Sequence, residues 1–94
     1  MGRLTTKDRD GNYQVEKDAI VGTQEGYSGP AIQKLGRIED LVEDLMAQQD
    51  RLSQELDALR LQGKTRSAQF REKMAHKLTN AHILSALKCA LSQC

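Results

Sequence analysis

The chain has 94 residues, a formal net charge of +1, 38% hydrophobic residues and three aromatic residues, Tyr13, Tyr27 and Phe70. A chain this short forms one small domain at most, and it gains a large core only by associating with something else. It has no apolar run as long as a membrane span and no hydrophobic signal-peptide core, so we expect a cytoplasmic protein without membrane contact.

The first predicted element lies in residues 7–17, KDRDGNYQVEK, where Asp8, Asp10 and Asn12 alternate like the first ligands of a calcium loop. Such a loop also needs glycine at position 6 and glutamate at position 12. Counted from Asp8, these positions hold a tyrosine and an alanine. The β-prone runs LTTK and NYQVE on either side of DRDG instead predict a β-hairpin, in which Gly11 takes a positive φ.

The next predicted element is one long helix over residues 31–63. Pro30 suits the first helical turn, and Gly63 suits a C-terminal cap. Between them, Leu, Ile and Val side chains, with one glutamine among them, recur at alternating steps of three and four without a slip. This is the heptad pattern of a coiled coil. A helix this long cannot bury its seam against so short a remainder, so we expect the seam to be the oligomerisation contact. Its residues are Leu35, Ile38, Val42, Leu45, Gln49, Leu52, Leu56 and Leu59.

The positions beside the seam contain no repulsive pair in a parallel two-stranded coil, and we expect a homodimer or a higher homo-oligomer whose helix orientation the sequence leaves open. In such a coil Lys34 would face Glu39 and Glu55 would face Arg60 of the other chain, and both are opposite-charge pairs. Gln49 would meet its symmetry mate and fix the register. The apolar stripe is wider than the seam, which leaves room for a third or fourth helix. The alternative is a monomer in which the long helix folds back on the basic segment that follows.

That segment is basic, whereas the long helix is acidic. Residues 28–62 carry four basic and seven acidic side chains, and residues 63–94 carry six basic side chains against Glu72 alone. This excess of positive charge is more than solubility requires, so we expect it to bind an acidic protein or a nucleic acid. The predicted partner-binding residues are Lys64, Arg66, Arg71, Lys73 and Lys77.

The basic segment is predicted to form two short helices. Phe70, Met74 and Leu78 share one face of the first, and Thr79 or Asn80 offers an N-cap for the second. A helix-turn-helix around KLTNA would place the second helix in a DNA major groove, but that helix has no arginine to read guanine.

Taken together, the elements predict an all-α fold in which a long coiled-coil-like helix is followed by two shorter helices, with a small N-terminal β-hairpin. The expected segments are the β-hairpin and linker (1–27), the long helix (28–63) and the basic helical segment (64–94).

The sequence offers no recognisable catalytic or metal-binding pattern. The soft metal ligands His76, His82, Cys89 and Cys94 form no CxxC or HxxxH pair. We find no glycine-rich phosphate loop and no paired carboxylates in an apolar setting. We therefore expect no enzyme activity, no metal and no cofactor. Cys89 and Cys94 make no disulfide framework, and we expect them to be reduced.

Three stretches carry a resemblance to a known family: RLTTKDRDGNYQV, EGYSGPAIQKLGRIEDLVEDL and LRLQGKTRSAQFREKMAHKLTNAHIL. Together they cover most of the chain. The chain resembles a family of small uncharacterised proteins encoded by prophages and mobile elements of Gram-positive bacteria. The resemblance implies a phage-derived protein, such as a transcriptional regulator, a structural accessory protein or an inhibitor of host defence.

The residues and the resemblance lead us to expect a non-enzymatic, oligomeric interaction protein that engages an acidic or polyanionic partner. A small DNA-binding regulator that acts through the basic segment is one alternative. A nucleotide-sequestering sponge, in which Tyr13 or Tyr27 stacks on a base, is another.

Overall fold

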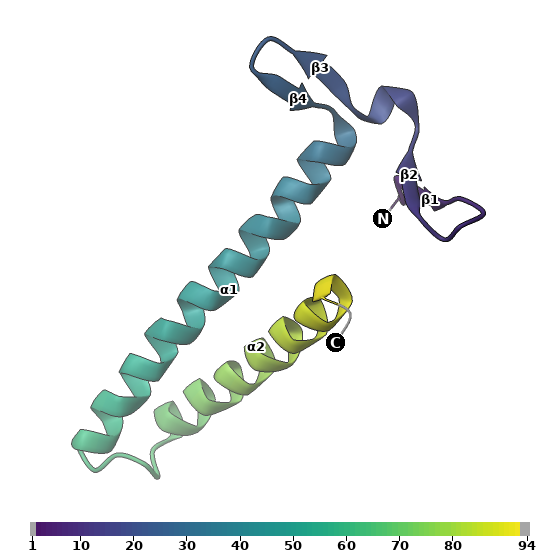
Figure 1. Ribbon diagram of the computed structural model, residues 1–94. Coiled ribbons are helices and arrows are strands. Elements are labelled where there is room, and N and C mark those ends of the chain that lie inside the picture. Colours follow the sequence, from purple (N-terminus) through teal and green to yellow (C-terminus); the bar gives the residue numbers. More distant parts are fainter. Residues whose placement is uncertain (1, 93–94) are drawn as a thin grey trace. The chain divides into compact units, whose positions relative to one another are not determined.

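A computed structural model describes residues 2–92, which contain four short strands, one 3₁₀ turn and two helices (Figure 1). The chain divides into two units, one up to Asp40 and the other from Leu41 onward. The long helix α1 (Pro30–Leu61) contributes residues to both units. No helix within residues 2–92 is both long and apolar enough to cross a membrane.

The predicted β-hairpin is present at the start of the first unit. Strand β1 (Thr5–Lys7) pairs antiparallel with β2 (Tyr13–Val15). Asp8 closes the turn, because its Oδ1 atom accepts hydrogen bonds of 2.9 Å from the backbone N–H groups of Asp10 and Asn12. Gly11 has the expected positive φ of 83°. The residues that resemble a calcium loop therefore form a turn.

A second β-hairpin follows, where the sequence predicted only a linker. Strand β3 (Val21–Thr23) pairs antiparallel with β4 (Gly26–Ser28) across a two-residue connection. Thr23 supports this connection by donating a hydrogen bond from Oγ1 to the Gly26 carbonyl at 2.9 Å. The connecting residues are Gln-Glu rather than the Asn-Gly or Asp-Gly that mark a tight β-turn, so the local signal for this β-hairpin is weak.

Gly29 joins β4 to the start of α1, within the first unit. A 3₁₀ turn, η1 (Lys17–Ala19), follows the first β-hairpin, and Ala19 is buried. A Cβ atom on Gly29 would lie 2.6 Å from the Ala19 carbonyl oxygen, and the φ of Gly29 is 116°. Only glycine allows this close approach without strain. Pro30 then begins α1, as predicted.

A tight turn connects α1 to the second helix, α2 (Ala68–Ser92). The N–H of Gly63 donates to the Arg60 carbonyl at 3.0 Å, and the N–H of Lys64 donates to the Leu59 carbonyl at 2.9 Å. These two bonds make a Schellman motif, and Gly63 supplies the positive φ of 72° that it requires. At the other end of the turn, Ser67 caps α2 by accepting the N–H of Phe70 on its Oγ at 3.1 Å.

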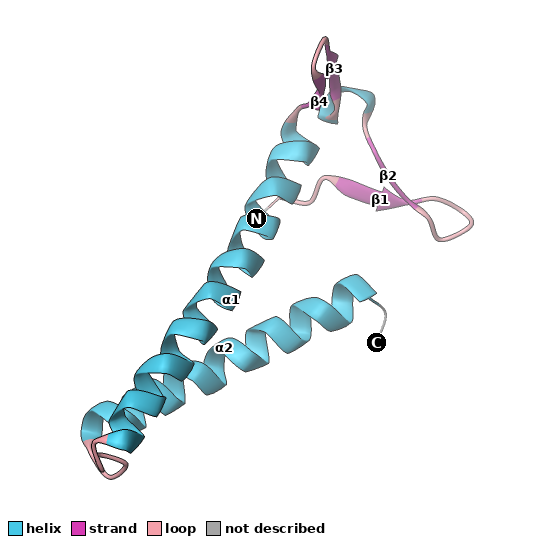
Figure 2. Cartoon of the chain, turned by 60° about the vertical axis from the view of Figure 1, so that its left-hand side comes forward, coloured by secondary structure: helices cyan, strands magenta, loops and turns pink. Residues whose placement is uncertain are grey.

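In the second unit, α2 folds back along α1 to form a helical hairpin (Figures 1 and 2). The buried apolar side chains between the two helices come mainly from the predicted seam of α1. They are Leu45, Leu52, Leu56 and Leu59 from α1 and Leu84 from α2. Leu56 has no exposed surface and is therefore the centre of this small core.

The prediction of an all-α fold with a long coiled-coil-like helix followed by two shorter helices is wrong. The described residues contain two β-hairpins, and a single helix, α2, occupies the basic segment. The apolar seam of α1 from Leu45 onward is buried by a helix of the same chain. The fold-back monomer, which the sequence left as the alternative, describes this unit better than a coiled coil.

The continuous course of α2 has a specific cause at Asn80. As an N-cap, Asn80 would use its side chain to bond the backbone of its own helix. Instead its Nδ2 donates to the Oε1 of Gln48 on α1 at 3.1 Å, and its residue surface is only 3% exposed. Because this tertiary contact occupies the side chain, the helix runs through KLTNA without a turn, and the helix-turn-helix interpretation is also wrong.

The prediction of reduced thiols is wrong for Cys89, which is disulfide-bonded in the structure. Cys94 lies outside the described residues.

Candidate interaction surface

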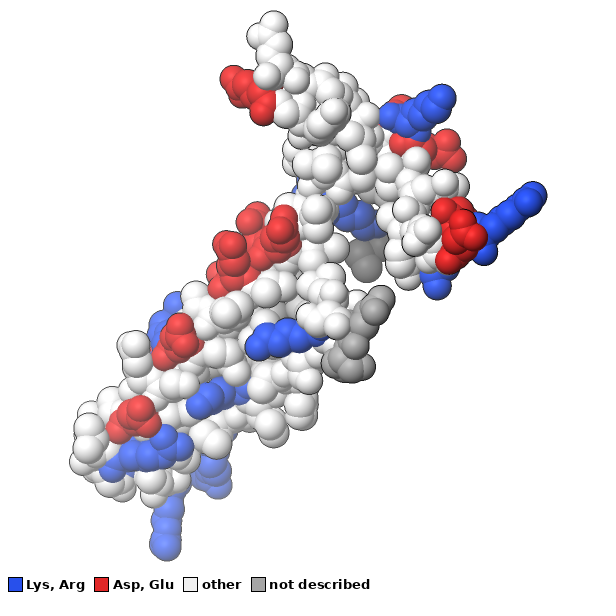
Figure 3. Space-filling model, in the orientation of Figure 1, with Lys and Arg blue, Asp and Glu red and all other residues white. Residues whose placement is uncertain are grey.

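The five predicted partner-binding residues lie at the turn of the helical hairpin and on the following part of α2. Lys64 and Arg66 belong to the turn, and Arg71, Lys73 and Lys77 belong to α2. Lys64, Arg66 and Arg71 are exposed, whereas Lys73 and Lys77 are half-buried. Figure 3 shows Lys and Arg side chains gathered at the turn end of the helical hairpin.

Lys73 is already paired within the chain. Its Nζ lies 2.5 Å from the Oε2 of Glu55 on α1, and the two side chains are 25% and 39% exposed. The hydrogen bond from Lys73 lowers the pKa of Glu55 from its ordinary 4.5. Partial burial opposes this shift, and the charges of Lys73 and Arg51 add to it. Lys73 therefore serves the packing of α2 against α1 more than it serves an outside partner.

The ion pair between Lys73 and Glu55 should make the stability of the helical hairpin depend on pH. Because the folded state lowers the pKa of Glu55, the pair contributes stability at pH values above 4.5, and this contribution is lost as the pH falls through the folded-state pKa. The wild type should therefore melt at a higher temperature than Glu55→Gln near neutral pH. The difference should shrink steadily below pH 4.5. Thermal melts of both proteins over a pH series would measure it, and a difference that does not change with pH would contradict the assignment.

Lys77 also faces the helix interface. Its backbone carbonyl accepts a hydrogen bond of 2.9 Å from the Nε2 of Gln49. Its half-buried position at heptad spacing from Lys73 and Asn80 places its aliphatic stem toward α1. Of the five predicted partner-binding residues, Lys73 and Lys77 therefore face α1, and the other three are exposed. Within residues 2–92, Lys64, Arg66 and Arg71 make no ion pair, and we call these three the basic turn.

Arg60 lies at the end of α1 but is held locally. Its Nη1 lies 2.8 Å from the Oδ1 of Asp57, and its guanidinium lies 5.4 Å from the ring centroid of Phe70. The cation–π contact joins the last turn of α1 to the first turn of α2. Arg60 therefore supports the shape of the basic turn without adding a free charge to it.

A layer of polar side chains crosses the middle of the helical hairpin. Asn80 bonds Gln48, and Gln49 bonds the carbonyl of Lys77. The Oε1 atom of Gln49 is buried and accepts no hydrogen bond within the described part of the chain. Gln49, expected to meet a symmetry mate in a coiled coil, thus meets α2 of its own chain.

Sequence reasoning missed Asn80 as an interface residue, although a signal was present. The residues of α2 that turn toward α1 follow steps of three and four, but half of them are polar. They are Phe70, Lys73, Lys77, Asn80, Leu84 and Leu87. Searching α2 for apolar periodicity alone selected Met74 and Leu78, which are 40% and 59% exposed.

The eight predicted oligomerisation residues fall into two groups. Leu45, Leu52, Leu56 and Leu59 are buried in the helical hairpin, and Gln49 is half-buried there. Val42 is half-buried, and Leu35 and Ile38, which belong to the first unit, are 50% and 38% exposed. The structure therefore assigns the second half of the seam to packing within the chain.

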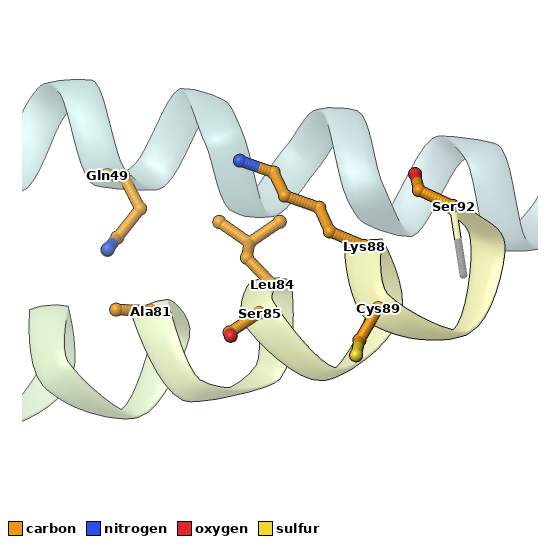
Figure 4. A pocket seen from close by; sticks show the side chains of 7 residues that line it. All are labelled: Gln49, Ala81, Leu84, Ser85, Lys88, Cys89 and Ser92. Carbon is orange, nitrogen blue, oxygen red and sulfur yellow. The ribbon is translucent and has the colours of Figure 1, made fainter. Parts of the chain in front are cut away.

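An open groove lies along one flank of the helical hairpin, between α1 and α2 (Figure 4). Its volume is about 550 Å³. Leu84 forms its apolar floor, and Gln49 reaches toward it from α1 (Figure 4). The lining residues are Gln49, Ala81, Leu84, Ser85, Lys88, Cys89 and Ser92. We call this the Gln49 groove.

The aromatic residues proposed for base stacking lie in the first unit. Tyr13 is 63% exposed, with the Lys7 ammonium 5.3 Å and the Arg3 guanidinium 6.0 Å from its ring centroid. Tyr27 is 75% exposed, on β4. Both rings are accessible, but two cations already occupy positions close to the Tyr13 ring.

Comparisons with protein-family models, curated proteins and solved structures gave no match. The resemblance to phage-encoded proteins therefore stays a prediction from the sequence.

Proposed function

We propose that this protein is a non-enzymatic interaction protein that binds an acidic protein surface through its basic turn. The proposal rests on one observation: Lys64, Arg66 and Arg71 are exposed and make no ion pair within residues 2–92. Lys64 and Arg66 lie in a turn that a Schellman motif closes on one side and the Ser67 cap closes on the other, and Arg71 lies in the first turn of α2. Residues in a closed turn and a helix lose less conformational entropy on binding than a flexible tail does.

The number of free charges favours an acidic protein over duplex DNA. A protein that binds DNA tightly typically neutralises about 6–10 phosphates. The basic turn offers three side chains, because Lys73 is paired with Glu55 and Lys77 faces α1. Three exposed cations within eight residues of sequence suit a small cluster of carboxylates. A phage-encoded inhibitor of a host protein, as the resemblance implies, would fit this role, and we place it in the cytoplasm.

The test is a charge reversal of the basic turn: Lys64→Glu, Arg66→Glu and Arg71→Glu together. With fluorescent poly-L-glutamate as the probe, the variant should bind at least about threefold more weakly, since three exposed ion pairs of roughly 0.2–1 kcal/mol each are lost. A matched control reverses three exposed, unpaired basic residues outside the basic turn, Arg9, Lys17 and Arg37. The control has the same net charge as the test variant and should bind like the wild type.

The salt dependence of binding separates the protein partner from DNA. Binding of a short DNA duplex through the basic turn alone should lose affinity with a slope of about −3 in log K against log salt, or 0.9 per phosphate contacted. A slope of about −5 or steeper, with tighter binding to DNA than to poly-L-glutamate, would favour the DNA-binding regulator. Equal binding by the test variant and the control would contradict a role for the basic turn.

A further inference from the structure

We propose that two copies of the chain associate through the flank of the helical hairpin that holds the Gln49 groove, with their basic turns at opposite ends of the dimer. This inference goes beyond the proposed function and does not depend on what the basic turn binds.

The flank is a continuous strip on both helices. On α2, five residues follow one another at steps of four and three, so they share one face beside the buried Leu84. They are Met74, Leu78, Ala81, Ser85 and Lys88. On α1, Met46 precedes Gln49 by three residues and is 51% exposed. Apolar side chains thus extend the groove in both directions, and no side chain within residues 2–92 covers it.

The flank exposes apolar side chains that a second copy would bury. Met46, Met74 and Leu78 are 51%, 40% and 59% exposed. A standard protein interface covers about 800 Å² on each partner. Two helices also bury side chains only where they face each other, whereas four helices enclose a core.

A second copy is the partner that fits this flank, because the flank carries both halves of a self-complementary contact. Ala81 and Ser85 are small and leave the groove open above Leu84. Met46 and Leu78 are large and stand exposed on either helix beside it. A two-fold interface brings the same patch of both copies together, so it requires projections and a hollow on one surface. Met46 and Leu78 of each copy would fill the groove of the other.

Charge decides the direction of the second copy. If the two-fold axis ran parallel to the helices, the two basic turns would lie together and six unpaired cations would repel one another. If the axis runs across the helices, the second copy is antiparallel and the basic turns lie far apart. The antiparallel dimer avoids the repulsion and presents one basic turn at each end.

The association is tested by sedimentation equilibrium of the full chain without any ligand. We expect a reversible dimer, and we expect Met46→Gln combined with Leu78→Gln to raise its dissociation constant at least about tenfold. Helix content by circular dichroism should stay the same, because both side chains are largely exposed. Ser85→Arg, which fills the groove from an exposed position, should weaken the dimer in the same way.

The matched control is Ile83→Gln. Ile83 is 40% exposed on α2, and it lies on the other side of Leu84 from Ser85, since successive helical residues turn by about 100°. It should leave the dissociation constant unchanged. A wild type that remains monomeric at high micromolar concentration would overturn the proposal, and so would an Ile83→Gln variant that weakens the dimer as much as the paired substitution.

The antiparallel direction of the two copies is tested by mixing the wild type with the variant whose basic turn is charge-reversed. Native mass spectrometry then counts the homodimers and heterodimers. In the antiparallel dimer the turns do not meet, so the heterodimer should make up about half of the dimers, as random exchange requires. A clear excess of heterodimer would show that basic and acidic turns attract each other, and it would overturn the antiparallel arrangement. None of these measurements involves a binding partner, so they can fail while the proposed function holds.

Discussion

Leu56→Ala should destabilise the second unit more than a substitution at any other leucine of the seam. Leu56 has no exposed surface, and it lies among Leu52, Leu59 and the facing side of α2. Removing a fully buried leucine typically costs about 2–5 kcal/mol, from lost burial and from the cavity left behind. In a domain of this size each kcal/mol lowers the melting temperature by roughly 4–8 °C, so a fall of more than about 10 °C is expected.

Urea unfolding followed by circular dichroism would measure this loss, at a concentration where the protein is monomeric. The control is Leu61→Ala, because Leu61 is the last residue of α1 and is 91% exposed. It should change the free energy of unfolding by less than about 0.5 kcal/mol. If Leu56→Ala destabilised the monomer no more than Leu61→Ala, the leucine would not be buried within its own chain.

Ala81→Pro should distinguish the single continuous α2 of the structure from the two shorter helices that the sequence predicted. In the sequence-based prediction, Ala81 follows an N-cap at Asn80, and proline is well tolerated at that first helical position. In the structure, Ala81 lies inside α2. Proline there removes a backbone hydrogen bond and clashes with the carbonyl four residues earlier, at a cost of about 3 kcal/mol or more.

The carbonyl four residues before Ala81 belongs to Lys77, which also accepts the hydrogen bond of Gln49. Ala81→Pro should therefore disturb the contact between the helices as well as α2 itself. Ala68→Pro is the matched control, because Ala68 is the first residue of α2 and follows the Ser67 cap. Thermal melts should show a large loss for Ala81→Pro and little change for Ala68→Pro. If both variants lost only a little thermal stability, the result would support the predicted helix boundary at Asn80 and contradict a continuous α2.

The parts of the fold that depend on local signals could be predicted from the sequence. Gly11 and the Asp8 side chain specify the first β-turn over a few residues, and Pro30 and Gly63 mark the ends of α1. These residues act through their own backbone geometry or through hydrogen bonds to near neighbours. No distant partner is needed to interpret them.

The candidate site was predicted only in part, because its residues depend on what they face. Charge density singled out residues 64–77, but composition cannot show that Lys73 pairs with Glu55 on α1. The second β-hairpin and the N-cap at Ser67 were missed because their local signals are weak. Asn80 was misassigned because its N-cap propensity is strong and its tertiary partner, Gln48, is 32 residues away.

The sequence by itself determined the first β-turn, the start and end of the long helix with its heptad seam, and the acidic and basic halves of the helical region. It did so because backbone preferences, residue spacing and net charge are properties of the chain alone. Only the tertiary structure decided that the seam from Leu45 to Leu59 packs on α2 of the same chain. A heptad shows that an apolar stripe needs a partner but does not identify it. Here the partner is a helix whose inward face carries Lys73, Lys77 and Asn80. Lys73 pairs with Glu55 and Asn80 bonds Gln48, both on α1. The carbonyl of Lys77 bonds Gln49, and its aliphatic side-chain carbons pack at the interface.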